Sequence, residues 1–299
     1  MVVLMAVLIV AGGFAARARA QDDLSSAAKS TPNPATEPLS PARVPWTIDF
    51  EPAIWFTAPN GNIRLAGNST TGNGQAFTAK DLNLDSTRIS PFGEIQARRG
   101  KWRLALRGFN FGLNNQGVQV GSAGQIGSAS FQPGDTLSSS MDLLSLSADV
   151  GYEISTTSRG FLDSGAPKYK LSVILLGGIR SIDTSFRSEV FRPGTSTPIA
   201  TTQSDALHAH PYGGVRLEME LFEDFTIDLL STLGGLTIGD TESWSSDILV
   251  GFQWNPTPHF GAQIGYRQLL MGIEQNNAPT EFSWQGGMAG LYGGTVIRF

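Results

Sequence analysis

Apolar and polar residues alternate in stretch after stretch from residue 225 to the end of the chain, and this alternation limits the possible folds more than any other feature. Within residues 243–254, Trp244, Val250 and Trp254 share one parity, whereas the other parity is mostly polar or glycine. A period of two is typical of a β-strand with one apolar and one polar face. Full charges at mid-strand on the polar faces favour a sheet rolled around a wet interior, with its apolar face outward. That is the pattern of outer-membrane barrels.

The same alternation, followed along the whole chain, predicts ten strands separated by turn signals. They cover residues 46–56, 88–98, 101–112, 138–154, 168–182, 205–221, 224–238, 243–254, 259–270 and 282–299. Short turns alternate with long loops rich in Gly, Ser and Asn, so the long loops fall on one side, as in an antiparallel up-and-down transmembrane β-barrel. Residues 155–167 are an exception and are predicted to form a longer turn on the side of the short turns. The predicted fold class is therefore all-β.

The strand count is open at residues 58–87. Residues 63–65 and 77–84 have the pattern of one more hairpin, which would give twelve strands. They are equally suited to prolonging the neighbouring strands above the membrane. We expect ten strands, with eight and twelve as alternatives.

The N-terminal residues predict export from the cytoplasm. Residues 2–14 are apolar or small but too few to span a bilayer as a helix, and Ala18-Arg19-Ala20 has the small-x-small pattern of a signal-peptide cleavage site. No Lys or Arg precedes the apolar run, which leaves a retained membrane anchor as an alternative. We expect residues 1–20 to be a signal peptide. Residues 21–45 are rich in Pro, Ser, Ala and Thr, and we expect them to be a disordered periplasmic leader. Residues 46–299 should form the barrel.

Composition argues against several classes of protein. The chain has no cysteine, so a disulfide framework and thiol chemistry are excluded. A formal net charge of −5 argues against nucleic acid as a partner. After residue 21 no apolar run approaches the length of a membrane helix, so integral insertion would have to use strands. We expect no cofactor.

Aromatic residues of outward parity collect at one end of the predicted strands, the end of the short turns. They are Trp46, Trp102, Tyr152, Tyr169, Phe225, Trp254, Phe260 and Phe299. Aromatic rings favour the boundary between membrane and water, where the body of the ring is buried and a polar tip stays wet. These residues therefore predict an aromatic girdle on the periplasmic side.

Charged residues of both signs share the inward parity. They are Glu94, Arg103, Arg107, Asp149, Glu153, Arg180, Arg216, Glu218, Asp228, Asp247, Arg267 and Arg298. Opposite charges on neighbouring strands offset each other's desolvation, and a ten-stranded barrel is far narrower than a porin. We therefore expect a salt-bridged lumen that is largely filled, with an ion-selective pore as the alternative.

Two ion pairs follow from the predicted registers. With a turn at Arg99-Gly100, Glu94 lies diagonal to Arg103 and Arg107, and with a turn at Gly100-Lys101 it lies directly opposite Arg107. A five-residue loop over 255–259 places Trp254 opposite Phe260 and Asp247 opposite Arg267. Both pairs should lie in the lumen.

The histidines are the main candidates for chemistry. His208 and His210 share an inward face on one strand, but the sequence supplies neither a third metal ligand nor a nucleophile motif. A polar lumen mouth explains them better than a metal site. We predict no catalytic residue and no metal, while an outer-membrane hydrolase or acyltransferase built on these histidines and the loop serines remains an alternative.

Several short stretches are similar to a group of small, poorly characterised bacterial outer-membrane β-barrel proteins. They are residues 80–85, 93–102 and 286–299, together with Gly265-Tyr266-Arg267, Asp228 and Gly234-Gly235. The resemblance implies the barrel fold and an outer-membrane location, and it lends no activity and no catalytic residues. It also implies that Ile297 and Phe299 in the last strand are the signal that the barrel assembly machinery recognises.

These features together predict a monomeric protein of the outer membrane, exported through its signal peptide and surrounded by outer-membrane lipid. Its lumen should be charged and largely filled, and its role should be a non-enzymatic one in the envelope or at the surface, exerted through the outer loops. A narrow channel for small polar solutes and an enzyme acting on lipid or peptide are the alternatives.

Overall fold

The computed structural model describes residues 45–65, 75–114, 117–165, 167–275 and 282–299. The predicted signal peptide (1–20) and all but the last residue of the predicted leader (21–45) lie outside the described residues. No helix in the described part is long and apolar enough to cross a membrane.

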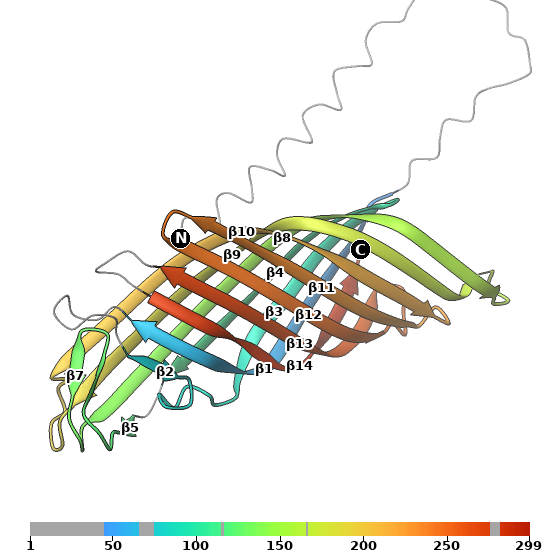
Figure 1. Cartoon of the computed structure of the whole chain (residues 1–299). Coiled ribbons are helices and arrows are strands. Elements are labelled where there is room, and N and C mark those ends of the chain that lie inside the picture. Colours follow the sequence, from blue (N-terminus) through green and yellow to red (C-terminus); the bar gives the residue numbers. More distant parts are fainter. Residues whose placement is uncertain (1–44, 66–74, 115–116, 166, 276–281) are drawn as a thin grey trace, which may run out of the picture. The chain divides into compact units, whose positions relative to one another are not determined.

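Ten long antiparallel strands follow one another around a closed sheet (Figure 1). They are β1 (Thr47–Leu65), β3 (Arg88–Arg99), β4 (Trp102–Asn114), β8 (Thr136–Phe161), β9 (Pro167–Phe191), β10 (Ala200–Leu221), β11 (Phe225–Ile238), β12 (Thr241–Trp254), β13 (Phe260–Gln275) and β14 (Phe282–Arg298). Each pairs with the next along the chain, and β14 pairs with β1 to close the ring. The prediction of an all-β, up-and-down barrel of ten strands is confirmed. We call the end where β1 begins and β14 ends the terminal end, and the opposite end the loop end.

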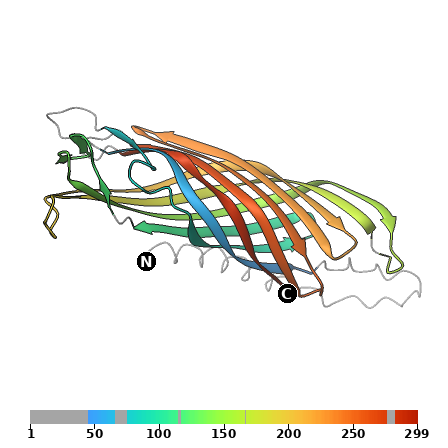
Figure 2. The same ribbon diagram turned by 90° about the horizontal axis from the view of Figure 1, so that it is seen from below.

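The loop end carries the short strands. Residues 63–65 prolong β1, so the alternative of strand extension is correct for them. Residues 77–84 do not prolong β3: β2 (Ala76–Thr78) is a separate short strand that pairs with residues 62–64 and is followed by a turn. The described residues 58–65 and 75–87 add no further long strand to the ring. Three more short strands lie in the connection from β4 to β8: β5 (Val118–Gln119), β6 (Gly124–Ile126) and β7 (Ala129–Phe131). The green β5–β7 region gathers beyond the barrel strands at this end in Figures 1 and 2.

The predicted turn over residues 155–167 is wrong. β8 and β9 continue as a paired hairpin from Ser155 opposite Val173 to Phe161 opposite Pro167, after a register shift between Glu153 and Ser155. The hairpin reaches past the neighbouring strands at the terminal end (Figure 2). Its Ser and Thr residues resemble a loop in composition, but strands that leave the bilayer no longer need apolar side chains, and threonine favours strands.

The outer surface of the barrel is apolar at mid-strand. Ile95, Val150, Leu175, Ile179 and Ile264 all face outward, and their exposed fractions lie between 46% and 63%. Each alternates with an inward-facing neighbour that is buried or partly buried. A surface of this kind is costly in water and stable in contact with hydrocarbon.

The interior is filled in two layers, and only one of them is charged. The layer toward the loop end is apolar and consists of Trp55, Phe92, Phe109, Phe111, Leu113, Met141, Leu143, Phe186, Leu269, Met271, Ile273, Trp284 and Met288. Leu82 and Leu84 from the connection after β2, with Ile126 and Phe131 from β6 and β7, belong to the same cluster. The sequence predicts a charged, largely filled lumen, and this half is filled by apolar side chains instead. In this half the alternation is reversed: in β4, for example, Phe109, Phe111 and Leu113 are buried, whereas Asn110 and Asn114 are exposed.

Candidate functional site

Acids and arginines from all ten long strands meet in the other layer, toward the terminal end, and all but Arg98 and Arg298 are buried. We call this set the ion network: Asp49, Glu51, Glu94, Arg98, Arg103, Arg107, Asp149, Arg180, Arg216, Glu218, Asp228, Asp247, Arg267 and Arg298. Acids and arginines are equal in number. The set is therefore neutral when every member is ionised, which limits the cost of placing so many charges out of water.

Glu94 on β3 is the first centre of the network. It accepts from Arg103 Nη2 at 3.1 Å, Arg107 Nε at 3.0 Å and Arg216 Nη1 at 2.8 Å. Glu94 lies directly opposite Arg107, so the turn is Gly100-Lys101, as in the second predicted register. The first register is wrong because Gly100, with a φ of +59°, takes the left-handed conformation of the tight turn.

Glu218 on β10 is the second centre. Arg98 Nη1 donates to its Oε2 at 2.8 Å, Arg216 Nε lies 3.2 Å from its Oε1, and Arg103 forms a further ion pair with Oε1. Arg216 also pairs with Asp228 through Nη2 and Oδ2 at 2.6 Å. Because Arg103 and Arg216 touch both Glu94 and Glu218, the two centres form one unit.

Asp247 on β12 is the third centre, and it lies against the apolar layer. Arg267 donates to both of its oxygens, at 3.1 Å and 2.8 Å, and Arg180 Nη2 donates to Oδ2 at 2.9 Å. The predicted register is wrong by two residues, since Asp247 faces Leu269 and Arg267 faces Leu249. The predicted pair is nevertheless in contact, because an arginine side chain is long enough to reach a diagonal neighbour.

Arg267 also marks the boundary between the two layers. Its guanidinium carbon lies 5.0 Å from the ring centroid of Trp55, 4.8 Å from that of Phe92 and 4.9 Å from that of Phe109. Cation–π contacts of this kind are strongest where water is excluded. The aromatic rings thus continue the packing where the ion pairs end.

Two of the predicted lumen charges lie apart from the buried centres. Glu153 is half-buried at the terminal end and has no ion pair within the described residues, and Arg298 is half-buried and pairs with Asp49 at 3.2 Å. The sequence reading missed Asp49, Glu51 and Arg98. Their inward parity, with Asp49 and Glu51 alternating with outward apolar residues, would have identified them.

Two buried tyrosines that the sequence reading also missed connect or cover the centres. The Tyr212 hydroxyl donates to Asp149 Oδ2 at 2.8 Å, and Arg180 lies over the Tyr212 ring at 5.0 Å from its centroid. Tyr292 on β14 is buried and packs edge-on against Phe92 at 5.6 Å. Tyrosine suits this position because its ring packs with the apolar layer while its hydroxyl remains polar.

The predicted girdle residues lie near the terminal end, on the outer surface. Trp46, Trp102, Tyr152, Trp254, Phe260 and Phe299 are exposed, and Phe225 and Tyr169 are half-buried. Trp102 and Tyr152 form an edge-to-face pair at 4.9 Å. Tyr169 lies beyond the level of Tyr152, away from the bilayer. Tyr152 on β8 lies opposite Leu175 on β9, whereas Tyr169 lies opposite Arg159 in the hairpin extension. Ile297 is half-buried, and the backbone of Phe299 is bonded to that of Ile48, at 2.9 Å and 3.3 Å, across the β1–β14 junction.

The two inward histidines take part in packing. His210 Nε2 lies 2.7 Å from Ser245 Oγ and its Nδ1 lies 3.2 Å from Ser243 Oγ, while Arg180 donates to Ser245 Oγ at 2.9 Å. A histidine that activates a serine needs a group that orients its other nitrogen, usually a carboxylate, and here that group is a second serine. Within the described part of the chain, His, Asp and Glu form no cluster with the grouping of a metal site.

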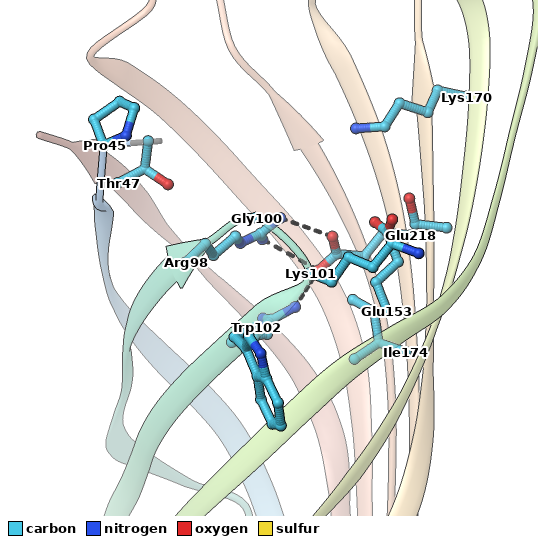
Figure 3. A pocket seen from close by; sticks show the side chains of 12 residues that line it. Pro45, Thr47, Arg98, Gly100, Lys101, Trp102, Glu153, Lys170, Ile174 and Glu218 are labelled. Atoms are coloured by element: carbon cyan, nitrogen blue, oxygen red, sulfur yellow. Dashed lines mark hydrogen bonds and ion pairs between the residues drawn. The ribbon is translucent and has the colours of Figure 1, made fainter. Parts of the chain in front are cut away.

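Two cavities lie at opposite ends of the barrel. One, of about 340 Å³ at the terminal end, is bordered by Arg98, Lys101, Arg103, Glu153 and Lys170 among others (Figure 3). The other, of about 190 Å³ at the loop end, is lined by Asn62, Arg64 and Glu274 with their neighbours on β1, β2, β13 and β14. The buried Ser–His pair lines neither cavity.

No protein-family model matches the chain. No curated protein matches it either. Among solved structures, the outer membrane protease OmpT of Escherichia coli is similar at 10% identity and a TM-score of 0.42, covering 85% of this chain and 97% of that one. Neisserial surface protein A aligns at 14% identity and a TM-score of 0.29, covering 85% and 97%. The toluene transporter TodX of P. putida aligns at 9% and 0.28, covering 84% and 90%. These three proteins differ in role, and similarities this distant do not bear on activity.

Proposed function

We propose that this chain is a non-enzymatic, integral outer-membrane protein whose lumen is sealed and which acts through its loop end at the cell surface. One observation carries the proposal: the interior is filled twice, by the ion network and by the apolar layer above it. A solute crossing the barrel would have to displace both. The ion network would oppose the passage of a solute through its paired charges, and the apolar layer through its close packing.

The outer surface supports the membrane location. The apolar belt at mid-strand needs hydrocarbon around it, and the aromatic side chains near the terminal end suit the interface. In this arrangement the protein is exported through its signal peptide, stands as a monomer in outer-membrane lipid, and turns its terminal end to the periplasm. The loop end then faces outward.

The ordered loop end supports a role in surface contact. β6 and β7 pair with each other, and their apolar residues Ile126, Ala129 and Phe131 are buried in the cluster below. In the turn after β2, Thr78 and Asp81 are bonded reciprocally, the Thr78 N–H donating to Asp81 Oδ2 at 2.9 Å. The hydrogen bonds from the Thr78 side chain and backbone lower the pKa of Asp81 below its usual value. A platform anchored in this way presents a constant surface to a partner.

Conductance tests the sealed lumen. In planar bilayers we expect the purified protein to give no porin-sized steps, because buried side chains of both layers fill the interior that the described residues enclose. Neutralising Arg103 and Arg107 together should lower stability without opening a pore, since the apolar layer is untouched. Stable conductance from the unmodified protein would overturn the proposal in favour of a narrow channel for small polar solutes.

Removal of Phe299 tests recognition by the barrel assembly machinery. The truncated protein should reach the outer membrane in smaller amounts, because it loses the terminal aromatic residue and the backbone bonds to Ile48. The measurement is the fraction of protein that resists extraction with urea from isolated outer membranes. Phe299→Leu is the matched variant, since it keeps the backbone bonds and removes only the ring. Full insertion of both variants would contradict this role.

A further inference from the structure

β10 rises beyond its neighbour β11 at the loop end. The pairing of these two strands stops at Tyr212 opposite Gly234, whereas β10 pairs with β9 along its whole length. If the register with β11 continued, Ile238 would lie opposite His208, so residues 200–207 extend past the β11–β12 turn. The gold β9–β10 hairpin reaches beyond the orange β11–β12 hairpin at this end in Figure 2. One edge of residues 200–207 therefore has no neighbouring strand among the described residues.

The ladder with β9 shows which peptide groups lie on this free edge. Phe222 N–H donates to the Lys168 carbonyl oxygen on β9 at 3.1 Å, and peptide groups alternate between the two edges of an antiparallel strand. Even-numbered residues of β10 therefore bond to β9, and odd-numbered residues face the other edge. Pro211 faces that edge too and has no N–H, which accounts for the end of the β10–β11 ladder beside it. In the free part of the strand the odd-numbered residues are Thr201, Gln203, Asp205 and Leu207.

The strand that carries the free edge is held on its other sides. β9 pairs with it throughout, from Ala200 opposite Val190 onward. On the inner face Thr202 is buried, and its side chain leaves no room for a side chain at Gly127, in the turn between β6 and β7. A strand fixed in this way loses little conformational freedom when another chain pairs with it.

Two apolar side chains next to the free edge are exposed in spite of their inward parity. Leu236 and Ile238 continue the series of Leu230 and Thr232, which are buried, yet they are 37% and 68% exposed. Hydrocarbon around the barrel does not account for them, because their parity directs them to the inner side of the wall. An extended chain that ran along β10 to the β11–β12 turn would bring every second side chain to this inner side, the last of them against Ile238.

The same region is acidic. Residues 200–211 and 235–246 contain no lysine and no arginine. Asp205 on β10 and Asp240 in the β11–β12 turn are exposed, and neither has an ion pair within the described residues. An added chain with basic side chains would therefore meet unpaired negative charge at both ends of its path.

We propose that this free edge of β10 binds an extended, basic segment of a partner protein as an added strand. The odd-numbered residues from Thr201 to Leu207 bond to the backbone of the segment. Its basic side chains lie beside Asp205 and Asp240, and an apolar side chain at its end covers Ile238. This inference rests on the proposed function, which places the loop end outside the cell.

The test is the fluorescence anisotropy of a labelled peptide of about eight alternating lysine and valine residues, titrated with the purified protein in a zwitterionic detergent. Gln203→Pro should weaken binding about tenfold, because it removes an N–H from the free edge and leaves the β9 ladder intact. Gln203→Ala is the matched control, since it shortens the same side chain and keeps the N–H. Asp205→Asn should also weaken binding, whereas Asp163→Asn, which changes an exposed acid at the terminal end, should not.

Each outcome decides the question. Binding that Gln203→Pro and Asp205→Asn weaken, and that the two controls leave unchanged, supports the proposal. Absence of binding, equal binding of a glutamate–valine peptide, or binding that Asp205→Asn leaves unchanged overturns it. A dimer in detergent that Gln203→Pro dissociates also overturns it, because a second copy of the chain then occupies the edge. Asp205→Asn leaves the backbone unaltered, so the decision does not depend on whether Gln203→Pro folds.

Failure of the proposed function is measured separately. Ser196→Cys, in the turn between β9 and β10, gives the chain a single cysteine, which a membrane-impermeant maleimide should label on intact cells. Absence of labelling would refute the outward orientation of the loop end, and conductance of the unmodified protein would refute the sealed lumen. The peptide titration in detergent depends on neither result.

Discussion

Replacing Glu94 with glutamine should lower the free energy of unfolding of the barrel by about 3–5 kcal/mol, the range found when one partner of a buried ion pair is removed. Glu94 holds Arg103, Arg107 and Arg216 together, and all four side chains are at most 4% exposed. Without its charge, the three guanidinium groups would repel one another in a site where water screens little. Equilibrium unfolding in urea after refolding into phospholipid vesicles, followed by tryptophan fluorescence, measures the effect.

Arg187→Gln is the control for this substitution. Arg187 pairs with Glu189 at 2.5 Å, but the two side chains are 53% and 24% exposed, so the pair should contribute only about 0–1 kcal/mol. Both variants remove one charge from an ion pair in the barrel. If they shifted the unfolding midpoint equally, the ion network would not be a source of stability.

Gly290→Ala should impair closure of the barrel. An added Cβ would fall on the carbonyl oxygen of Phe56, 2.8 Å from its carbonyl carbon and 3.1 Å from the Cα of Thr57. All three are backbone atoms of β1, which cannot move away without breaking the β1–β14 ladder. We expect a loss of roughly 1–3 kcal/mol or more, and a smaller folded fraction, because this pairing completes the ring.

Gly293→Ala on the same strand provides the comparison. Its nearest neighbour would be the Gln263 carbonyl oxygen at 3.8 Å, an ordinary contact distance. This variant should fold as the wild type does or gain slightly, since alanine costs less backbone entropy than glycine. The assay is the gel shift between folded and heat-unfolded protein. Equal folded fractions for the two variants would show that the β1–β14 junction tolerates a side chain.

The sequence predicted the barrel because hydrocarbon imposes a strict rule on the outer face. Wherever a strand crosses the bilayer, side chains such as Val150 and Ile264 must be apolar and their neighbours face inward, so strands and parity follow from alternation. The rule says nothing about strands outside the bilayer, and for this reason the extension of β8 and β9 was missed.

The contents of the interior were less predictable. Inward parity identified Glu94, Arg103 and Asp247 as lumen residues, but it cannot say which side chains from distant strands meet, and the Glu218–Arg98 contact was missed. Register depends on the exact turn. Relative to the first predicted registers, the turn at Gly100-Lys101 and the longer one after Trp254 each move the direct partners by two residues. The apolar layer lies where the polarity of the two strand faces reverses, as in β4, where Phe111 is buried and Asn110 is exposed, and the prediction did not take this reversal into account.

The hairpin extension of β8 and β9 leaves one edge of β8 without a paired strand. β4 begins at Trp102, opposite Tyr152, so the edge of Ile154–Phe161 that faces away from β9 has no neighbouring strand among the described residues. A closed barrel has no edges, yet this segment restores one, with peptide groups available to another extended chain. Arg159 and Gly160, whose φ is +64°, together with the irregularity at Glu153, are features that discourage indiscriminate strand addition. Residues 154–161 of β8 therefore present an unpaired strand edge outside the ten-stranded ring.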